Sequence, residues 1–214
     1  MMIRKQNLEM LLILIFVFAG LQGFSKNSKT GNNAEWYLAA KSEGISLYYR
    51  WINLGDSIKS REMKAEFTID AEIPEILSHF SNTESYKNWA AGIKKCSITK
   101  ISDSVWFTHT VMNYPWPFKQ KDLVTRHLVE QNGLNATIEI EAAPDFFSET
   151  KGIERLKNYQ GTWFLSARKN GSTKVDYRII SFTKLMFPRF VQDPIVQKLS
   201  INSLVNLKQL AEKK

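Results

Sequence analysis

The sequence predicts an α+β domain in which a curved antiparallel sheet wraps around one long C-terminal helix. Most of the chain alternates between apolar and polar residues, which is typical of strands with one buried and one wet face. One early segment changes to the helical period after a proline, and the C-terminal segment carries a single apolar stripe. We find no internal repeat and expect one domain over residues 34–214.

The first 25 residues have the layout of a secretory signal peptide. Arg4 and Lys5 precede an apolar block, Met10–Phe18, and small residues follow it. The uncharged stretch is shorter than the roughly 20 residues that span a bilayer, and an uncleaved membrane anchor is the alternative. We expect residues 1–25 to be removed, residues 26–33 to form a flexible linker, and the domain to be periplasmic or secreted.

The N-terminal part of the domain is expected to contain a hairpin and then short helices. Residues 35–40 are predicted to form a short helix. Alternation over Gly44–Ile52 and Arg61–Asp70, with a turn at 54–57, predicts an antiparallel hairpin. A helix begins at Pro74. A second short helix or turn is predicted over residues 86–93.

Further strands and the long helix complete the predicted domain. The strands are Lys95–Ile101, Val105–Tyr114, Leu123–Glu130, Leu134–Ala142, Gln160–Arg168 and Lys174–Phe182. Asp193 is expected to cap the last helix, with Pro194 at its first position. The apolar stripe of that helix consists of Ile195, Val196, Leu199, Leu204, Leu207 and Leu210. The stripe provides the face that the sheet grips.

Composition narrows the function classes. Aromatic residues make up 12% of the chain, so either the core is very aromatic or an apolar ligand is bound. The net charge of +8 becomes +7 without residues 1–25, which suits an anionic membrane surface or serves solubility alone. The basic residues are dispersed and form no basic helix, so we expect no nucleic acid partner. The single cysteine, Cys96, excludes a disulfide framework within the chain.

Catalytic and metal-binding signatures were not found. The sequence has no GxSxG, P-loop, GxGxxG or HExxH motif. His109 and His127 flank the loop around Trp116, and they face each other if that loop is centred near Phe118. Two adjacent imidazoles could form half of a metal site, but no third ligand lies at an obvious position. We therefore expect no metal and no cofactor.

Two apolar loops stand out, Tyr114–Phe118 and Leu185–Val191. Each carries aromatic residues and proline between predicted elements. Such loops either fold back onto the core or contact lipid, because exposed apolar loops are unfavourable on a monomer.

Short motifs follow one another in an order that spans nearly the whole mature chain. They are Asn88-Trp89, Val105–His109 before a proline-containing loop, Lys121–Arg126, Gly161–Trp163 and Phe187-Pro188. In this order, from Trp36 to Glu212, the chain resembles the START (StAR-related lipid transfer) family of the helix-grip superfamily. Lysine stands at position 121, where the family motif begins with arginine.

The resemblance implies a tunnel between the sheet and the C-terminal helix that holds one apolar ligand, such as a sterol or phospholipid. The residues expected to line or gate it are Trp89, Phe107, His109, Tyr114, Trp116, Phe118, Arg126, His127, Ile138, Ile140, Trp163, Tyr177, Ile179, Leu199 and Leu204. Arg126, His109 and His127 are the candidates for orienting the polar end of the ligand. Arg126 has an alternative role in an ion pair with Asp122 or Glu130.

Three functional hypotheses remain at this point. The first is a monomeric, non-catalytic lipid carrier with transient contact to an anionic membrane. The second is a helix-grip enzyme, aromatase/cyclase-like or hydrolytic, in which His109 or His127 acts as general acid–base. The third is a scaffold whose cavity is filled by its own aromatic side chains.

Overall fold

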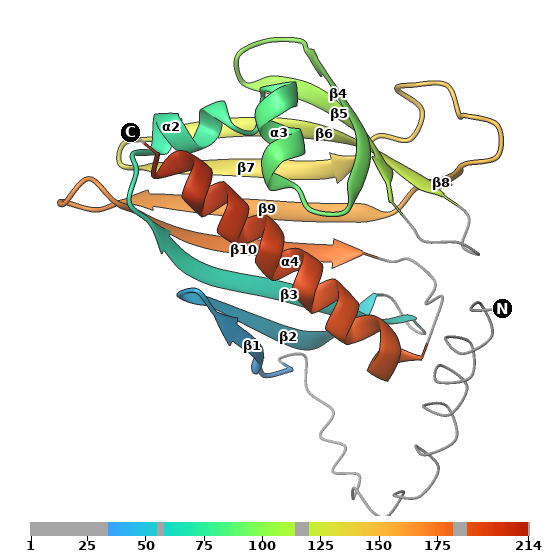
Figure 1. Cartoon of the computed structure of the whole chain (residues 1–214), viewed down its shortest axis with the longest axis horizontal. Coiled ribbons are helices and arrows are strands. Elements are labelled where there is room, and N and C mark those ends of the chain that lie inside the picture. Colours follow the sequence, from blue (N-terminus) through green and yellow to red (C-terminus); the bar gives the residue numbers. More distant parts are fainter. Residues whose placement is uncertain (1–33, 55–57, 114–119, 182–187, 214) are drawn as a thin grey trace, which may run out of the picture. The chain divides into compact units, whose positions relative to one another are not determined.

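The computed structural model describes residues 34–54, 58–113, 120–181 and 188–213 (Figure 1). The strands are β1 Tyr37–Ser42, β2 Ile45–Leu54, β3 Ile58–Ile69, β4 Ile93–Lys100, β5 Val105–Met112, β6 Lys121–Asn132, β7 Asn135–Ala142, β8 Glu154–Leu156, β9 Tyr159–Ala167 and β10 Thr173–Ser181. The helices are α2 Ile73–Ser78, α3 Thr83–Trp89 and α4 Arg189–Ala211. The predicted signal peptide and linker lie outside the described residues.

One sheet contains every strand of the described residues. Its order is β1-β2-β3-β10-β9-β7-β6-β5-β4, and each neighbouring pair along this order is antiparallel. Strand β8 adds to β6 in parallel. The three helices lie on the same side of the sheet, and α4 runs diagonally across it (Figure 1). The predicted fold class, a curved antiparallel sheet with a long C-terminal helix, is confirmed.

The core lies between the sheet and the helices. We call the side of the sheet that packs against the helices the inner face. Its buried apolar side chains include Ile45, Leu47, Ala65, Phe67, Ile138, Trp163, Leu165 and Val175. The helices contribute Ile73, Ile76, Trp89, Ile201, Leu204 and Leu207 to the same cluster. Removal of this apolar surface from water stabilises the fold by roughly 25 cal/mol per Å².

The prediction of a helix over residues 35–40 is wrong. Residues 37–40 belong to strand β1, which pairs with β2 through a tight turn at Glu43 and Gly44. Both turn residues have positive φ, of 50° and 75°. The cross-strand partners Tyr37 and Tyr49 place their ring centroids 6.0 Å apart. Pairing at the edge of β2 satisfies backbone groups that a short isolated helix leaves to water.

The predicted start of the last helix is also wrong. Helix α4 begins at Arg189, and Pro194 lies inside it rather than at its first position. The amide nitrogens of Val191 and Gln192 donate to the carbonyl of Pro188, which closes the first turn. Asp193 does not cap the helix, because its carboxylate binds a side chain of the sheet instead.

Candidate ligand-binding site

The register of the sheet arranges inner-face side chains in adjacent cross-strand rows. One row runs from Leu47 through Ala65, Tyr177 and Trp163 to Ile138. The next row consists of Tyr49, Met63, Ile179, Gly161, Ile140, His127 and Trp106. Thr125 of β6 pairs with Thr108 of β5 in a third row, and on the same face Trp51 of β2 pairs with Arg61 of β3. The rows therefore change from apolar to partly polar across the inner face.

An aromatic cluster joins helices α2 and α3 to the sheet. Phe80 lies 4.9 Å from Trp163 and 5.2 Å from Trp89, measured between ring centroids. Trp163 stacks on Tyr177 at 4.1 Å. The Trp89 indole nitrogen donates to the carbonyl of His79 at 3.1 Å. These rings give the inner face a rigid apolar wall, since offset and edge-to-face contacts are the favoured arrangements of aromatic pairs.

Three tyrosine hydroxyls are buried beside this wall. The hydroxyls of Tyr159 and Tyr177 lie 3.2 Å apart and form a hydrogen bond. Burial raises the pKa of Tyr86, of Tyr159 and of Tyr177 above the ordinary value of 10.0. All three phenols are therefore neutral at physiological pH.

A polar group of side chains interrupts the apolar inner face on β5 and β6. We call Trp106, Thr108 and His127 the polar patch; their exposed fractions are 1%, 0% and 1%. The indole nitrogen of Trp106, the hydroxyl of Thr108 and Nδ1 of His127 have no hydrogen-bond partner among the described residues. The rings of Trp106 and His127 stack at 5.1 Å, and Nε2 of His127 lies 3.0 Å from the hydroxyl of Thr125. Burial lowers the pKa of His127 to about 3, so its ring is neutral.

An ion pair joins the N-terminal half of α4 to the sheet. Both terminal nitrogens of Arg61 donate to the carboxylate of Asp193, at 2.6 and 2.7 Å. The guanidinium also lies 3.8 Å from the ring centroid of Tyr49. Burial opposes the charge of Arg61, but the bond to Asp193 outweighs it and the pKa of Arg61 is raised. Nearby, Arg189 lies over the ring of Trp51 at 4.7 Å.

The N-terminal half of α4 exposes apolar side chains. Phe190, Ile195 and Leu199 expose 73%, 52% and 40% of their surface, and Val191 and Val196 are also exposed. Farther along the helix, Leu204 and Leu207 are buried at 2% and 0%. From its N-terminus to its C-terminus the helix therefore changes from a partly exposed apolar segment to a buried one.

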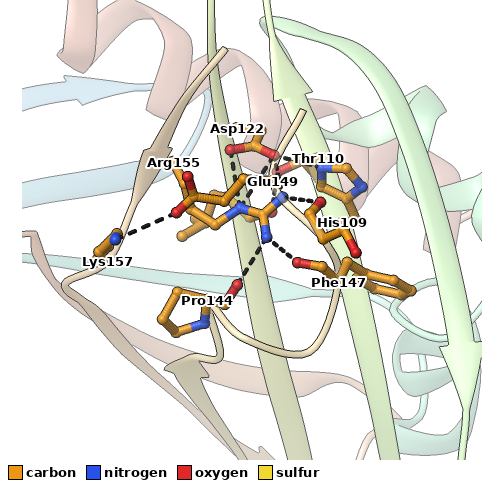
Figure 2. Close-up of polar contacts among 10 residues, drawn as sticks. His109, Thr110, Asp122, Pro144, Phe147, Glu149, Arg155 and Lys157 are labelled. Atoms are coloured by element: carbon orange, nitrogen blue, oxygen red, sulfur yellow. Dashed lines mark hydrogen bonds and ion pairs between the residues drawn. The ribbon is translucent and has the colours of Figure 1, made fainter. Parts of the chain in front are cut away.

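The opposite face of the sheet carries a separate polar cluster (Figure 2). The single Nε–H of Arg155 donates a bifurcated hydrogen bond to the two carboxylate oxygens of Asp122, at 3.2 and 3.3 Å, and Nη2 donates another at 2.6 Å. It also donates to the backbone carbonyls of Pro144, Phe147 and Ser148. Asp122 receives a further contact from Nε2 of His109 at 2.8 Å. Burial alone would raise the pKa of Asp122, but Arg155 and His109 outweigh it and the pKa is lowered.

This outer cluster fixes the chain between β7 and β9 over the sheet. Phe107 stacks on Phe146 with ring centroids 3.5 Å apart, and His109 stacks on Phe147 at 5.7 Å. Asp122, which the sequence offered as a partner for Arg126, is instead bound by Arg155 and His109.

The fifteen predicted lining or gate residues do not share one face. Those on the inner face are His127, Ile138, Ile140, Trp163, Tyr177 and Ile179, with Trp89 on α3 and Leu204 on α4. Leu199, on α4, is 40% exposed. Tyr114, Trp116 and Phe118 are outside the described residues. Phe107, His109 and Arg126 lie on the outer face, so they do not line a cavity beneath α4.

The expectation that His109 and His127 face each other is wrong. His109 pairs with Val124, and His127 pairs with Trp106. The two histidines are therefore offset by three residues, an odd number that places them on opposite faces of the sheet. Among the described residues there is no group of three or more His, Cys, Asp or Glu side chains arranged for a metal ion.

Sequence reasoning missed Trp106, Thr108 and Arg61 as inner-face residues. The β5 segment VWFTHTVM shows no clear alternation, because both of its faces are covered. Trp106 is covered on the inner side, while Phe107 is covered by Phe146 on the outer side. An available signal was the pair of threonines, Thr108 and Thr110, in a strand that is otherwise mostly apolar.

A pocket of about 310 Å³ lies at one end of the domain, away from these rows. It is lined by the start of α2 and by the turns after β6 and β9. None of the fifteen predicted residues lines it. No helix of the described residues is long and apolar enough to cross a membrane.

Comparison with known proteins identifies the fold. No family model matches the chain. The crystal structure of a STAR-related lipid transfer protein from Xanthomonas axonopodis superposes with a TM-score of 0.73 at 23% identity, covering 83% of this chain and 99% of that chain. The fold is that of the StAR-related lipid transfer domains. Human StAR-related lipid transfer protein 5 has the same START-like fold, with a TM-score of 0.64 at 13% identity over 97% of this chain and 93% of that chain.

The START-like fold is also found in an enzyme. The Zhui aromatase/cyclase from Streptomyces superposes with a TM-score of 0.51 at 11% identity, covering 71% of this chain and 93% of that chain. An uncharacterized protein of Pseudomonas aeruginosa is 22% identical over 182 residues, which cover 84% of this chain and 88% of that protein. Because fold does not determine function, the side chains of the inner face have to distinguish carrier from enzyme.

Proposed function

We propose that the protein is an exported, non-catalytic lipid carrier that holds one apolar ligand between the inner face and α4. The observation that carries the proposal is the composition of the inner face. Apolar and aromatic side chains from several strands and all three helices surround a few buried polar atoms without partners. A mostly apolar lining with few polar groups is typical of small-molecule sites.

The START-like neighbours support this reading. The Xanthomonas axonopodis protein and the human protein are both named as lipid transfer proteins. The ion pair of Arg61 with Asp193 holds the N-terminal half of α4 against the sheet. When this pair breaks and that half moves away from the sheet, a ligand can reach the inner face.

A native mass spectrum of the full chain expressed with export tests the proposal. We expect the mature chain without residues 1–25, together with one noncovalently bound lipid per protein that is released on organic extraction. Vesicles are expected to exchange this lipid with the purified protein. A protein that retains no lipid and exchanges none would contradict the carrier function, and an intact residue 1–25 segment would contradict signal cleavage alone.

The second candidate, a cyclase-like enzyme, has one observation in its favour, the buried imidazole of His127 with a free Nδ1. Two observations weigh against it. The pKa of His127 is lowered to about 3, far from the range in which a general acid–base works at neutral pH. His109, the other candidate, is on the outer face and is bound to Asp122.

A further inference from the structure

The chemistry of the polar patch points to one kind of ligand group. Trp106 and His127 pair across β5 and β6, and Thr108 is next on the same face of β5. All three side chains are almost completely buried and keep a polar atom without a partner among the described residues. A buried polar atom without a hydrogen bond destabilises the fold, so such atoms normally have a specific role.

Each of the three atoms can form a hydrogen bond with an uncharged oxygen. The indole nitrogen of Trp106 can only donate, and the hydroxyl of Thr108 can donate or accept. In neutral His127 one ring nitrogen donates and the other accepts. Nε2 contacts the hydroxyl of Thr125, so Nδ1 accepts if Nε2 donates there, and donates if Nε2 accepts. A ligand hydroxyl or carbonyl oxygen accepts from the indole and bonds to either of the other two groups.

The patch carries no positive charge. Burial keeps His127 neutral, with a pKa of about 3. Lys121 shares this face of β6, but its ammonium is bound to Glu154 at 3.0 Å. Lys100, the cross-strand partner of Trp106, is exposed to water. Arg61 lies on the same face but on β3, and its guanidinium is bound to Asp193. A phosphate would therefore be desolvated beside neutral donors, which is unfavourable for a charged group.

We propose that Trp106, Thr108 and His127 together bind an uncharged hydroxyl or carbonyl group of the ligand, which makes a neutral lipid, rather than a phospholipid, the cargo. This inference rests on the proposed carrier function and adds the substrate class. The stacking of Trp106 on His127 and the contact of His127 with Thr125 hold the patch in one geometry before the ligand arrives. Such preorganisation lowers the cost of binding.

Three probes of equal chain length test the inference: hexadecane, hexadecanol and hexadecyl phosphate. Each competes with the fluorescent probe N-phenyl-1-naphthylamine for the delipidated full-length mature protein. We expect hexadecanol to bind roughly tenfold more tightly than hexadecane, because one or two neutral hydrogen bonds to its hydroxyl contribute an affinity difference of about that size. Hexadecyl phosphate is expected to bind more weakly than hexadecanol.

Thr108→Val is the informative variant, because it removes the hydroxyl and keeps the shape. The preference for hexadecanol over hexadecane is expected to fall to about threefold or less, with hexadecane affinity unchanged. Thr110→Val is the matched control: Thr110 lies on the same strand face, but its hydroxyl already donates to the carbonyl of Leu123 at 3.3 Å. That variant is expected to keep the full preference. Trp106→Phe gives an independent second test if either valine variant folds poorly.

The possible failures are distinguishable. Equal binding of hexadecanol and hexadecane, tighter binding of hexadecyl phosphate, or an unchanged preference in both Thr108→Val and Trp106→Phe overturns the neutral-lipid inference while the carrier function stands. If none of the three probes displaces the dye and no lipid is retained from cells, the carrier function fails and the inference fails with it.

Discussion

His127 illustrates how burial decides the chemistry of a single residue. Its exposed fraction is 1%, and its ring lies between the indole of Trp106 and the hydroxyl of Thr125. No carboxylate of the described residues is bonded to it, so desolvation alone acts on its charge and the pKa falls to about 3. Its neutral ring provides a hydrogen-bonding group without a charge.

This depressed pKa predicts a dependence of stability on pH. The unfolded histidine has a pKa of about 6.5, so between that value and about 3 the unfolded chain binds one more proton than the folded chain. Stability from neutral His127 is therefore complete above pH 6.5 and falls as the pH drops toward 3. We expect a loss of about 2 kcal/mol between pH 7 and pH 5 from this group.

Urea unfolding of the wild type and of His127→Gln at both pH values measures this contribution. The variant retains the other two histidines, so the difference between the two proteins isolates His127. The free energy of unfolding should fall by about 2 kcal/mol more in the wild type than in the variant. Parallel losses in both proteins would contradict the burial of a neutral ring.

At the scale of the elements, α4 is held unevenly. Its C-terminal half is anchored by Leu204 and Leu207, which are buried in the core. Its N-terminal half is joined to the sheet by the ion pair of Arg61 with Asp193 and exposes Phe190 and Ile195. Pro194 lies in this half and removes one backbone hydrogen-bond donor. The half that opens most readily is therefore the one held by the ion pair.

Asp193→Asn is expected to accelerate lipid exchange. The substitution keeps the shape but weakens two charge-assisted hydrogen bonds to Arg61, so that opening of α4 becomes about tenfold more frequent. Transfer of a fluorescent lipid between vesicles measures the rate. Asp176→Asn is the matched control, since its ion pair with Arg178 lies within β10. Equal rates for wild type and Asp193→Asn would exclude the ion pair as a latch.

At the scale of the whole molecule, charge and apolar surface favour contact with a membrane. The mature domain has a net charge of +7 in the proposed processing, from 27 basic and 20 acidic residues. The exposed face of α4 adds Phe190, Ile195 and Leu199. Basic charge draws a protein to an anionic bilayer, and exposed apolar side chains then insert at its interface.

Phe190→Ser combined with Ile195→Ser is expected to weaken binding to vesicles that contain anionic phosphatidylserine by about tenfold or more. The double variant removes apolar surface that the bilayer would otherwise cover. Co-flotation of protein with vesicles measures it. Leu134→Ser is the control, because Leu134 is as exposed as Phe190, at 73%, but lies in the turn between β6 and β7. A loss as large with Leu134→Ser would show that the contact is not specific to α4.

Local patterns in the sequence determined most of the elements of this protein. Alternation located the strands and an apolar stripe located α4, because both patterns arise from neighbouring residues on one element. The short β8 was missed, since a strand as short as Glu154–Leu156 carries too little pattern to recognise. Residues 35–40 were misassigned because their strand structure depends on pairing with β2.

The tertiary structure decided what the side chains do. The sequence of the connection between β5 and β6 does not by itself determine which residues of the two strands pair. In the structure His109 pairs with Val124, three residues from His127, so His109 lies on the outer face and His127 on the inner face. Register likewise joined Asp122 to Arg155, and the packing of α4 on the sheet joined Asp193 to Arg61; the partners in each pair are distant in sequence. Alternation of apolar and polar residues in the sequence indicates that a strand has one apolar and one polar face. Which face meets the helix, and which buried atoms meet there, follows from packing of the whole sheet.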